Sequence, residues 1–171
     1  MNVASTKLCD CANGPGMRVS VFVSGCRRHC KGCFNQITWD FNYGTLYDKK
    51  YRNYINEVLK EPYIDGLSIL GGEPFEPENS FSSWNLAIMA KRHGKNVWAY
   101  SGFTFEELYS HRSVFDCVYE LLKEVDVLVD GPFVEEEKDI TLKFRGSRNQ
   151  RIIDIPASIK AGKAVFVEEY M

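Results

Sequence analysis

The sequence predicts an α/β fold, a partial (open) (β/α) barrel of about five to six mostly parallel strands with helices on the outside. Segments rich in β-branched and aromatic residues alternate with segments of helical periodicity, which calls for parallel strands joined by crossover helices. The chain has 171 residues, whereas a closed barrel of eight such units takes about 250. Small, polar and cysteine residues follow the strands. An open α/β sheet is the alternative.

The first half of the chain contains two predicted strands, each followed by a helix. Arg18 to Ser24 is β-branched and aromatic, which indicates a strand. From Asp48 the apolar residues recur at helical spacing, and Pro62 ends that helix. Gly66 to Leu70 is the second strand, and a helix is expected from about Phe81 to His93.

The second half continues the alternation. Val97 to Tyr100 is the third strand, and Thr104 with Glu107 has the spacing of a capping box, so a helix begins there. A further helical stretch runs roughly from Ser113 to Lys123. Three more strands are expected at Val125 to Asp130, Gln150 to Ile155 and Ala164 to Val167.

The composition is that of an ordinary globular protein. It has 21 basic and 23 acidic residues, a net charge of −2, and 44% hydrophobic residues. This length and balance predict one domain over residues 1–171 and argue against nucleic acid or a membrane as a partner. No stretch reaches the roughly 20 apolar residues of a membrane span. The first residues lack the apolar core of a secretion signal, so we expect a cytoplasmic protein.

The residues that follow four predicted strands indicate where the site lies. In parallel α/β folds the carboxyl ends of the strands meet at one rim, and ligands bind there. The segments expected at that rim are Gly25-Cys26, Gly71-Gly72-Glu73-Pro74, Ser101-Gly102 and Asp130-Gly131-Pro132.

Three of the six cysteines follow the first predicted strand at the spacing C-x3-C-x2-C: Cys26, Cys30 and Cys33. Clustered cysteines in a reducing compartment indicate metal or redox chemistry. A structural zinc site would need a fourth ligand, and His29, Cys9 or Cys11 are available. An iron–sulfur cluster held by only three cysteines would keep one iron open, as a cluster that acts on a substrate requires. Both alternatives stay open on spacing alone.

The cysteine loop and several other motifs resemble a known family. The C-x3-C-x2-C spacing after the first strand and Gly71-Gly72-Glu73-Pro74 after the next are similar to the two main motifs of the radical S-adenosylmethionine superfamily. Further segments resemble the activating proteins of anaerobic (class III) ribonucleoside-triphosphate reductases, over about Asn13 to Ile153. These segments are Asn13 to Arg18, Gly32 to Asn35, Thr38-Trp39, Asp126 to Gly131 and Phe144 to Arg151.

The resemblance implies a function and its cofactors. Cys26, Cys30 and Cys33 would hold a [4Fe-4S] cluster whose fourth iron binds S-adenosylmethionine. Reductive cleavage of S-adenosylmethionine would give a 5′-deoxyadenosyl radical. That radical would take a hydrogen atom from a glycine of the anaerobic reductase and leave a glycyl radical. The protein would therefore be an oxidoreductase with the reductase as its protein substrate and an external one-electron donor such as flavodoxin.

The same resemblance assigns residues to S-adenosylmethionine. Gly71, Gly72 and Glu73 are expected at the methionine ammonium group. The segment Gly32, Cys33 and Phe34 is expected beside the adenosine. Related activases bind a monovalent cation near the methionine carboxylate, and the counterparts by position are Ser101 and Asp130.

Other conspicuous residues receive simpler interpretations. Cys9 and Cys11 are expected not to be cluster ligands, and Cys117 is expected to be a small core residue. His29 is expected to face solvent. The arginine-rich segment 145–151 is expected to line the site or to meet the partner protein.

Overall fold

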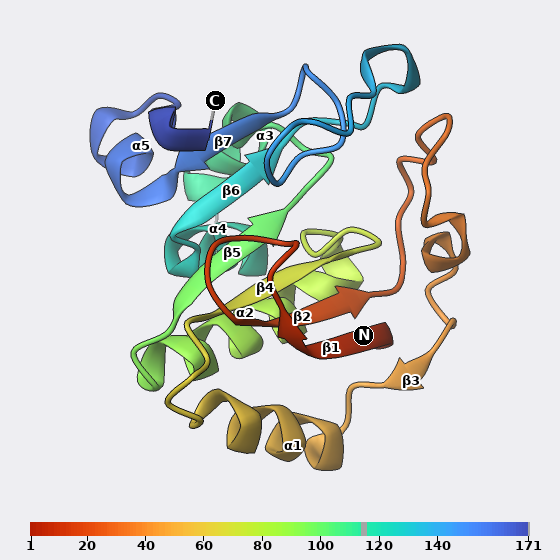
Figure 1. The fold of residues 1–171 in the computed structure, drawn as a ribbon, viewed down its shortest axis with the longest axis vertical. Coiled ribbons are helices and arrows are strands. Elements are labelled where there is room, and N and C mark those ends of the chain that lie inside the picture. The colour runs from red at the N-terminus through yellow and green to blue at the C-terminus, as the bar shows by residue number, and fades with distance from the viewer. Residues whose placement is uncertain (114–115, 171) are drawn as a thin grey trace.

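A computed structural model describes residues 1–113 and 116–170 of the chain (Figure 1). These residues form a seven-stranded sheet in the order β3-β1-β2-β4-β5-β6-β7. The strands are β1 Asn2–Asp10, β2 Arg18–Val23, β3 Thr45–Leu46, β4 Gly66–Gly71, β5 Asn96–Tyr100, β6 Val127–Asp130 and β7 Arg151–Asp154. Strands β2, β4, β5 and β6 are parallel, and both flanks of the sheet are antiparallel. An α/β fold with parallel central strands is thus confirmed, and the open-barrel curvature stays a prediction.

Both flanks of the sheet differ from the prediction. Strand β1 was not predicted, because its alternating polar residues leave one face exposed and its sequence lacks an apolar run. The prediction of a strand at Ala164 to Val167 is wrong. That segment joins the sheet only through a bridge between Ile153 and Phe166 and two flanking backbone hydrogen bonds.

Along the chain, helices α1 to α4 lie between strands and α5 follows β7. They are α1 Lys49–Leu59, α2 Pro77–Arg92, α3 Phe105–Ser110, α4 Cys117–Glu124 and α5 Ile155–Ala161. The capping box of Thr104 and Glu107 is present at the start of α3. Helix α2 begins at Pro77, one turn before the prediction, because proline is well tolerated in the first helical turn.

The helix predicted at Ser113 to Lys123 is observed in part. Asp116 caps α4 by accepting two backbone N–H groups, so the helix begins at Cys117. Residues 114–115 of the prediction lie outside the described residues. Cys117 is the first residue of the helix and only partly buried, so its prediction as a core residue is wrong.

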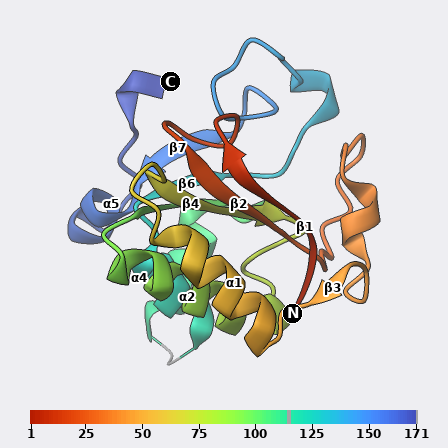
Figure 2. The same cartoon turned by 60° about the horizontal axis from the view of Figure 1, so that its bottom comes forward.

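Helices α1, α2 and α4 lie on one side of the sheet (Figure 2). Side chains alternate between the faces of a strand, so one half of each central strand packs against these helices. Examples are Val21 of β2, Ile69 of β4 and Leu86 of α2, all fully buried. The opposite face carries a smaller cluster around Trp98, which leaves that face of the sheet free to hold a cavity.

In the described part of the chain, no helix has the length and apolar character needed to cross a membrane.

Candidate functional site

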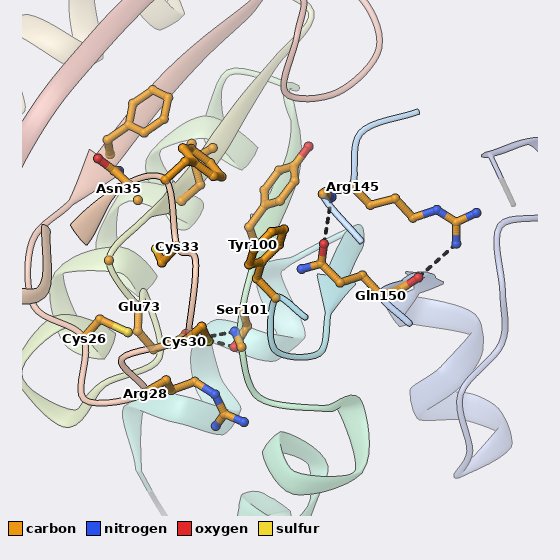
Figure 3. A pocket seen from close by; sticks show the side chains of 18 of the residues that line it. Cys26, Arg28, Cys30, Cys33, Asn35, Glu73, Tyr100, Ser101, Arg145 and Gln150 are labelled. Carbon is orange, nitrogen blue, oxygen red and sulfur yellow. Dashed lines mark hydrogen bonds between the residues drawn. The ribbon is translucent and has the colours of Figure 1, made fainter. Parts of the chain in front are cut away.

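A cavity of about 380 Å³ lies at the carboxyl ends of β2, β4 and β5 (Figure 3). Its volume is within the range of small-molecule sites, which runs from about 300 to 1,000 Å³. Most of the residues predicted for the site line it: Cys26, Cys30, Cys33, Phe34, Gly71, Gly72, Glu73 and Ser101. The rim predicted from the strand ends is therefore where the structure places a cavity.

The three cysteines lie on a loop, residues 24–33, which we call the cysteine loop. Backbone hydrogen bonds fix its first part, from Gly25 N–H to the Thr38 carbonyl at 2.7 Å and from Cys26 N–H to the Trp39 carbonyl at 3.2 Å. In its second part, the Cys33 N–H donates to the Cys30 carbonyl at 3.1 Å. The loop therefore turns back on itself and presents all three thiols to one cavity.

His29 and Gly32 let the loop turn, because both adopt positive φ. The His29 ring is exposed and stacks on Trp39 with centroids 4.5 Å apart, so its predicted exposure is confirmed. Gly32 is exposed and does not line the cavity. A Cβ at Gly32 would come within 2.7 Å of the Glu135 side chain, so this position serves loop packing.

The three thiols form no disulfide, so each is available as a thiolate ligand for a metal or an iron–sulfur cluster. Cys26 is buried, and burial, followed by the nearby negative charge of Glu73, raises the pKa of its thiol to about 11. Because thiolates are the metal-binding form, metal binding at Cys26 must release a proton.

Cys9 and Cys11 are exposed and lie outside the cavity lining. Among the described residues, no three His, Cys, Asp or Glu side chains form a group that could hold one metal ion.

Gly71 and Gly72 bring the end of β4 against the end of β2. Gly72 N–H donates to the Val23 carbonyl at 2.7 Å, and Glu73 N–H donates to the Gly25 carbonyl at 2.9 Å. A Cβ at Gly72 would lie only 2.6 Å from the Gly25 oxygen, closer than real Cβ contacts. Only glycine fits here, and the turn of β4 is thereby joined to the cysteine loop.

Glu73 lines the cavity from a fully buried position. One carboxylate oxygen accepts the Ser101 hydroxyl at 2.9 Å and Phe75 N–H at 3.1 Å, and the other accepts Gly102 N–H at 2.7 Å. Burial raises its pKa to about 7, against the opposing effect of these hydrogen bonds. Glu73 therefore ties β4 to the end of β5, and its predicted contact with a ligand ammonium stays a prediction.

Asp130 is placed differently from the prediction. It is 0% exposed and is not among the residues that line the cavity. Its carboxylate accepts Phe105 N–H at 2.6 Å and forms hydrogen bonds with the Arg151 guanidinium at 2.9 and 2.5 Å. The side chain thus joins α3 and β7 to β6. This geometry disfavours Asp130 as a cation ligand, because a cation would have to displace Arg151.

Two side-chain amides organise the site: Asn79, which sequence reasoning missed, and Gln150, which lies in the predicted segment 145–151. The buried Asn79 amide donates to the carbonyls of Ser24 at 2.9 Å and Glu73 at 3.0 Å, so α2 holds two strand ends together. The Gln150 side-chain oxygen Oε1 accepts Gly146 N–H at 2.8 Å, while its side-chain NH2 group donates to the Gly131 carbonyl at 3.1 Å. The only sequence signal for Asn79 was a polar amide next to a motif, which is too common to be specific.

The segment 145–151 borders the cavity, as predicted. Arg145, Gly146 and Gln150 line it. Figure 3 shows Arg145 and Gln150 on the opposite side of the cavity from the three cysteines. The Arg145 guanidinium donates to the main-chain carbonyl of Gln150 at 2.9 Å, which helps to close this segment into a compact wall.

Known proteins resemble this chain over most of its length. Residues 12–153 match the family model described as a 4Fe-4S single cluster domain. The chain is 41% identical over 147 residues to the anaerobic ribonucleoside-triphosphate reductase-activating protein of Vibrio cholerae, which covers 84% of this chain and 91% of the relative. The chain belongs to the family of anaerobic ribonucleoside-triphosphate reductase-activating proteins. The match favours an iron–sulfur cluster over the zinc site that the cysteine spacing left open.

Two further members of the family show the same extent of similarity. The activating protein of Enterobacteria phage T4 is 36% identical over 156 residues, which is 89% of this chain and 93% of that protein. The activating protein of Escherichia coli K12 is 37% identical over 145 residues, which is 82% of this chain and 90% of that protein. Family membership therefore rests on whole-length similarity as well as on the cysteine loop.

Proposed function

We propose that this protein is a radical S-adenosylmethionine activase that installs a glycyl radical on an anaerobic ribonucleoside-triphosphate reductase. One observation carries the proposal. The three thiols of the C-x3-C-x2-C loop line the same cavity as Gly71, Gly72 and Glu73, in a chain whose relatives are named as activating proteins of that reductase.

The donor set of the cavity fits a [4Fe-4S] cluster with three protein ligands. Cys26, Cys30 and Cys33 would hold it, and the lining of the described residues also offers space for a small molecule beside them. When bound, the reduced cluster supplies the electron that cleaves S-adenosylmethionine, and the resulting 5′-deoxyadenosyl radical takes a hydrogen atom from the target glycine. An external donor such as flavodoxin would supply that electron.

The chain's own residues would bind S-adenosylmethionine, orient it and shield it. The tight Gly71-Gly72 turn lets the backbone approach the methionine end of the cofactor, and Glu73 adds negative charge there when ionised. Ser101 is buried in the same wall. Phe34 lines the cavity yet is 87% exposed, so it stands at the mouth, where a loop of the reductase would enter.

The test is anaerobic reconstitution followed by electron paramagnetic resonance of the reduced protein with and without S-adenosylmethionine. We expect about four iron and four sulfide per chain and a signal that changes when the cofactor binds. With the reductase added, a glycyl radical should appear. Cys26→Ala should abolish cleavage of S-adenosylmethionine, whereas the matched control Cys9→Ala, at an exposed cysteine outside the cavity, should keep it.

Two results would contradict the proposal. Full cleavage activity in Cys26→Ala would remove the cysteine loop from the mechanism. Zinc in the freshly isolated protein, without absorption near about 400 nm from iron–sulfur charge transfer, would instead indicate a zinc-stabilised binding module.

A further inference from the structure

Glu76 is a buried carboxylate that joins α2 to the cysteine loop. It lies just before Pro77 and is 4% exposed. One of its oxygens accepts the backbone N–H of Arg27 at 2.9 Å, and the other accepts the Arg27 guanidinium at 2.7 Å. Arg27 directly follows Cys26. A single carboxylate therefore holds both the main chain and the side chain of the residue next to the first thiol.

Arg27 is held on two further sides. Glu78 accepts from its guanidinium through both carboxylate oxygens, at 2.8 and 2.5 Å, and the Phe41 ring lies 4.4 Å from the guanidinium carbon. The hydrogen bonds that Arg27 donates to Glu78 and Glu76 raise the pKa of its guanidinium above its usual range. Forked contacts of this kind fix the orientation of a guanidinium as well as its position. The Arg27 side chain is thus ordered although more than half of it is exposed.

The main chain of Glu76 is anchored independently of its side chain. Its carbonyl accepts the N–H groups of Asn79 and Ser80, both at 2.8 Å, and its own N–H donates to the Glu73 carbonyl at 3.3 Å. The side chain makes no capping hydrogen bond to α2. Both carboxylate oxygens are therefore directed to Arg27, and they transmit the position of α2 to the cysteine loop.

We propose that Glu76 is a positioning residue that acts through Arg27 to keep Cys26 in the geometry that binds the cluster. This proposal rests on the proposed function, because that function makes Cys26 a cluster ligand. Groups that orient a metal ligand commonly change metal affinity by ten- to a hundredfold when they are removed. Glu78 provides a matched control, because it binds the same guanidinium and carries the same charge but does not reach the backbone N–H.

The first experiment measures alkylation of Cys26 by iodoacetamide in the reduced, metal-free protein. Peptide mass spectrometry follows each cysteine separately. We expect Glu76→Ala to label Cys26 on the order of tenfold faster than wild type, because a charge-assisted hydrogen bond to the loop is lost. Glu78→Ala should change that rate less than about twofold, and Cys9 should label equally in all three proteins. An unchanged Cys26 rate in folded Glu76→Ala protein would overturn the proposal.

A second measurement does not depend on a variant that folds. Amide hydrogen exchange in the wild-type protein should be slow at Arg27, whose N–H is bound by a buried carboxylate. Exchange at the rate of an unstructured amide would overturn the proposal.

The cluster-loaded protein supplies a third measurement. Glu76→Ala should lose iron to a chelator on the order of tenfold faster than Glu78→Ala, and Glu76→Gln should recover part of the difference. Equal rates of iron loss in the two alanine variants would contradict the positioning role. If the proposed function itself fails, wild-type protein will not cleave S-adenosylmethionine, while the labelling and exchange results still report on Glu76.

Discussion

The buried Glu73 makes stability depend on pH in a direction opposite to most carboxylates. Burial raises its pKa from 4.5 to about 7, so the folded state holds this proton more tightly than the unfolded state does. Stability from this group is therefore complete below pH 4.5 and declines as pH rises through about 7. Between pH 5 and pH 8 the loss is roughly 2–3 kcal/mol of unfolding free energy, because each pKa unit corresponds to about 1.4 kcal/mol.

Glu73→Gln removes this titration while keeping the size of the side chain. Urea unfolding of the reduced, metal-free protein at pH 5, 6, 7 and 8 compares the variant with wild type. We expect the difference in unfolding free energy to move by roughly 2–3 kcal/mol in favour of the variant as pH rises. Its absolute value at any one pH also contains altered hydrogen bonds to Ser101 and Gly102, so the pH trend carries the test.

Glu78→Gln is the control for this experiment. Glu78 is exposed, and its hydrogen bonds to Arg27 lower its pKa to about 2, so it stays ionised from pH 5 to pH 8 in the folded protein. Its variant should show little change relative to wild type over pH 6 to 8. A flat difference between wild type and Glu73→Gln across the whole range would refute the assignment of a buried, proton-binding Glu73.

Three further predictions concern the site and the contacts around it. Gly72→Ala should destabilise the protein by about 1–3 kcal/mol in urea unfolding, because the new Cβ meets backbone oxygens of Gly25 and Thr38; a change below about 0.5 kcal/mol would contradict that crowding. Gln150→Ala should speed amide exchange at Gly146 on the order of tenfold, since a part-buried N–H loses its acceptor, and unchanged exchange would show that another group satisfies it. Arg151→Met should lower the unfolding free energy by about 3 kcal/mol by leaving buried Asp130 unpaired; most of that loss should return when Asp130→Asn is added, and no recovery would contradict the pairing.

Local pattern was sufficient for the central sheet and the main parts of the site. The strands at Arg18 to Ser24 and Gly66 to Leu70 were predicted within about one residue of their ends, because β-branched runs bounded by glycine are a local signal. Since carboxyl ends of parallel strands share one edge, the sequence predicts Cys26 and Gly72 at the same rim. The structure places both in the cavity lining.

Pattern was insufficient where a residue's partner lies far away in the chain. Asp130 follows a strand as the other rim residues do, yet Arg151 and Phe105 hold its carboxylate outside the cavity. Strand β1 pairs along a flank where three of its nine residues are exposed and alternate with partly buried ones, so it has no strong apolar signal of its own. In each case the deciding contacts depend on the packing of other segments.

The sequence by itself determined which residues are the candidate ligands: the spacing of Cys26, Cys30 and Cys33 and the glycine turn after the next strand are local, covalently set features. The tertiary structure alone decided what holds them in place. Glu76 reaches Arg27 across 49 residues of chain. Such a contact depends on the packing of α2 against the sheet, which sets the direction and the burial of the Glu76 side chain. A linear pattern of residue types contains neither the direction nor the burial of a side chain.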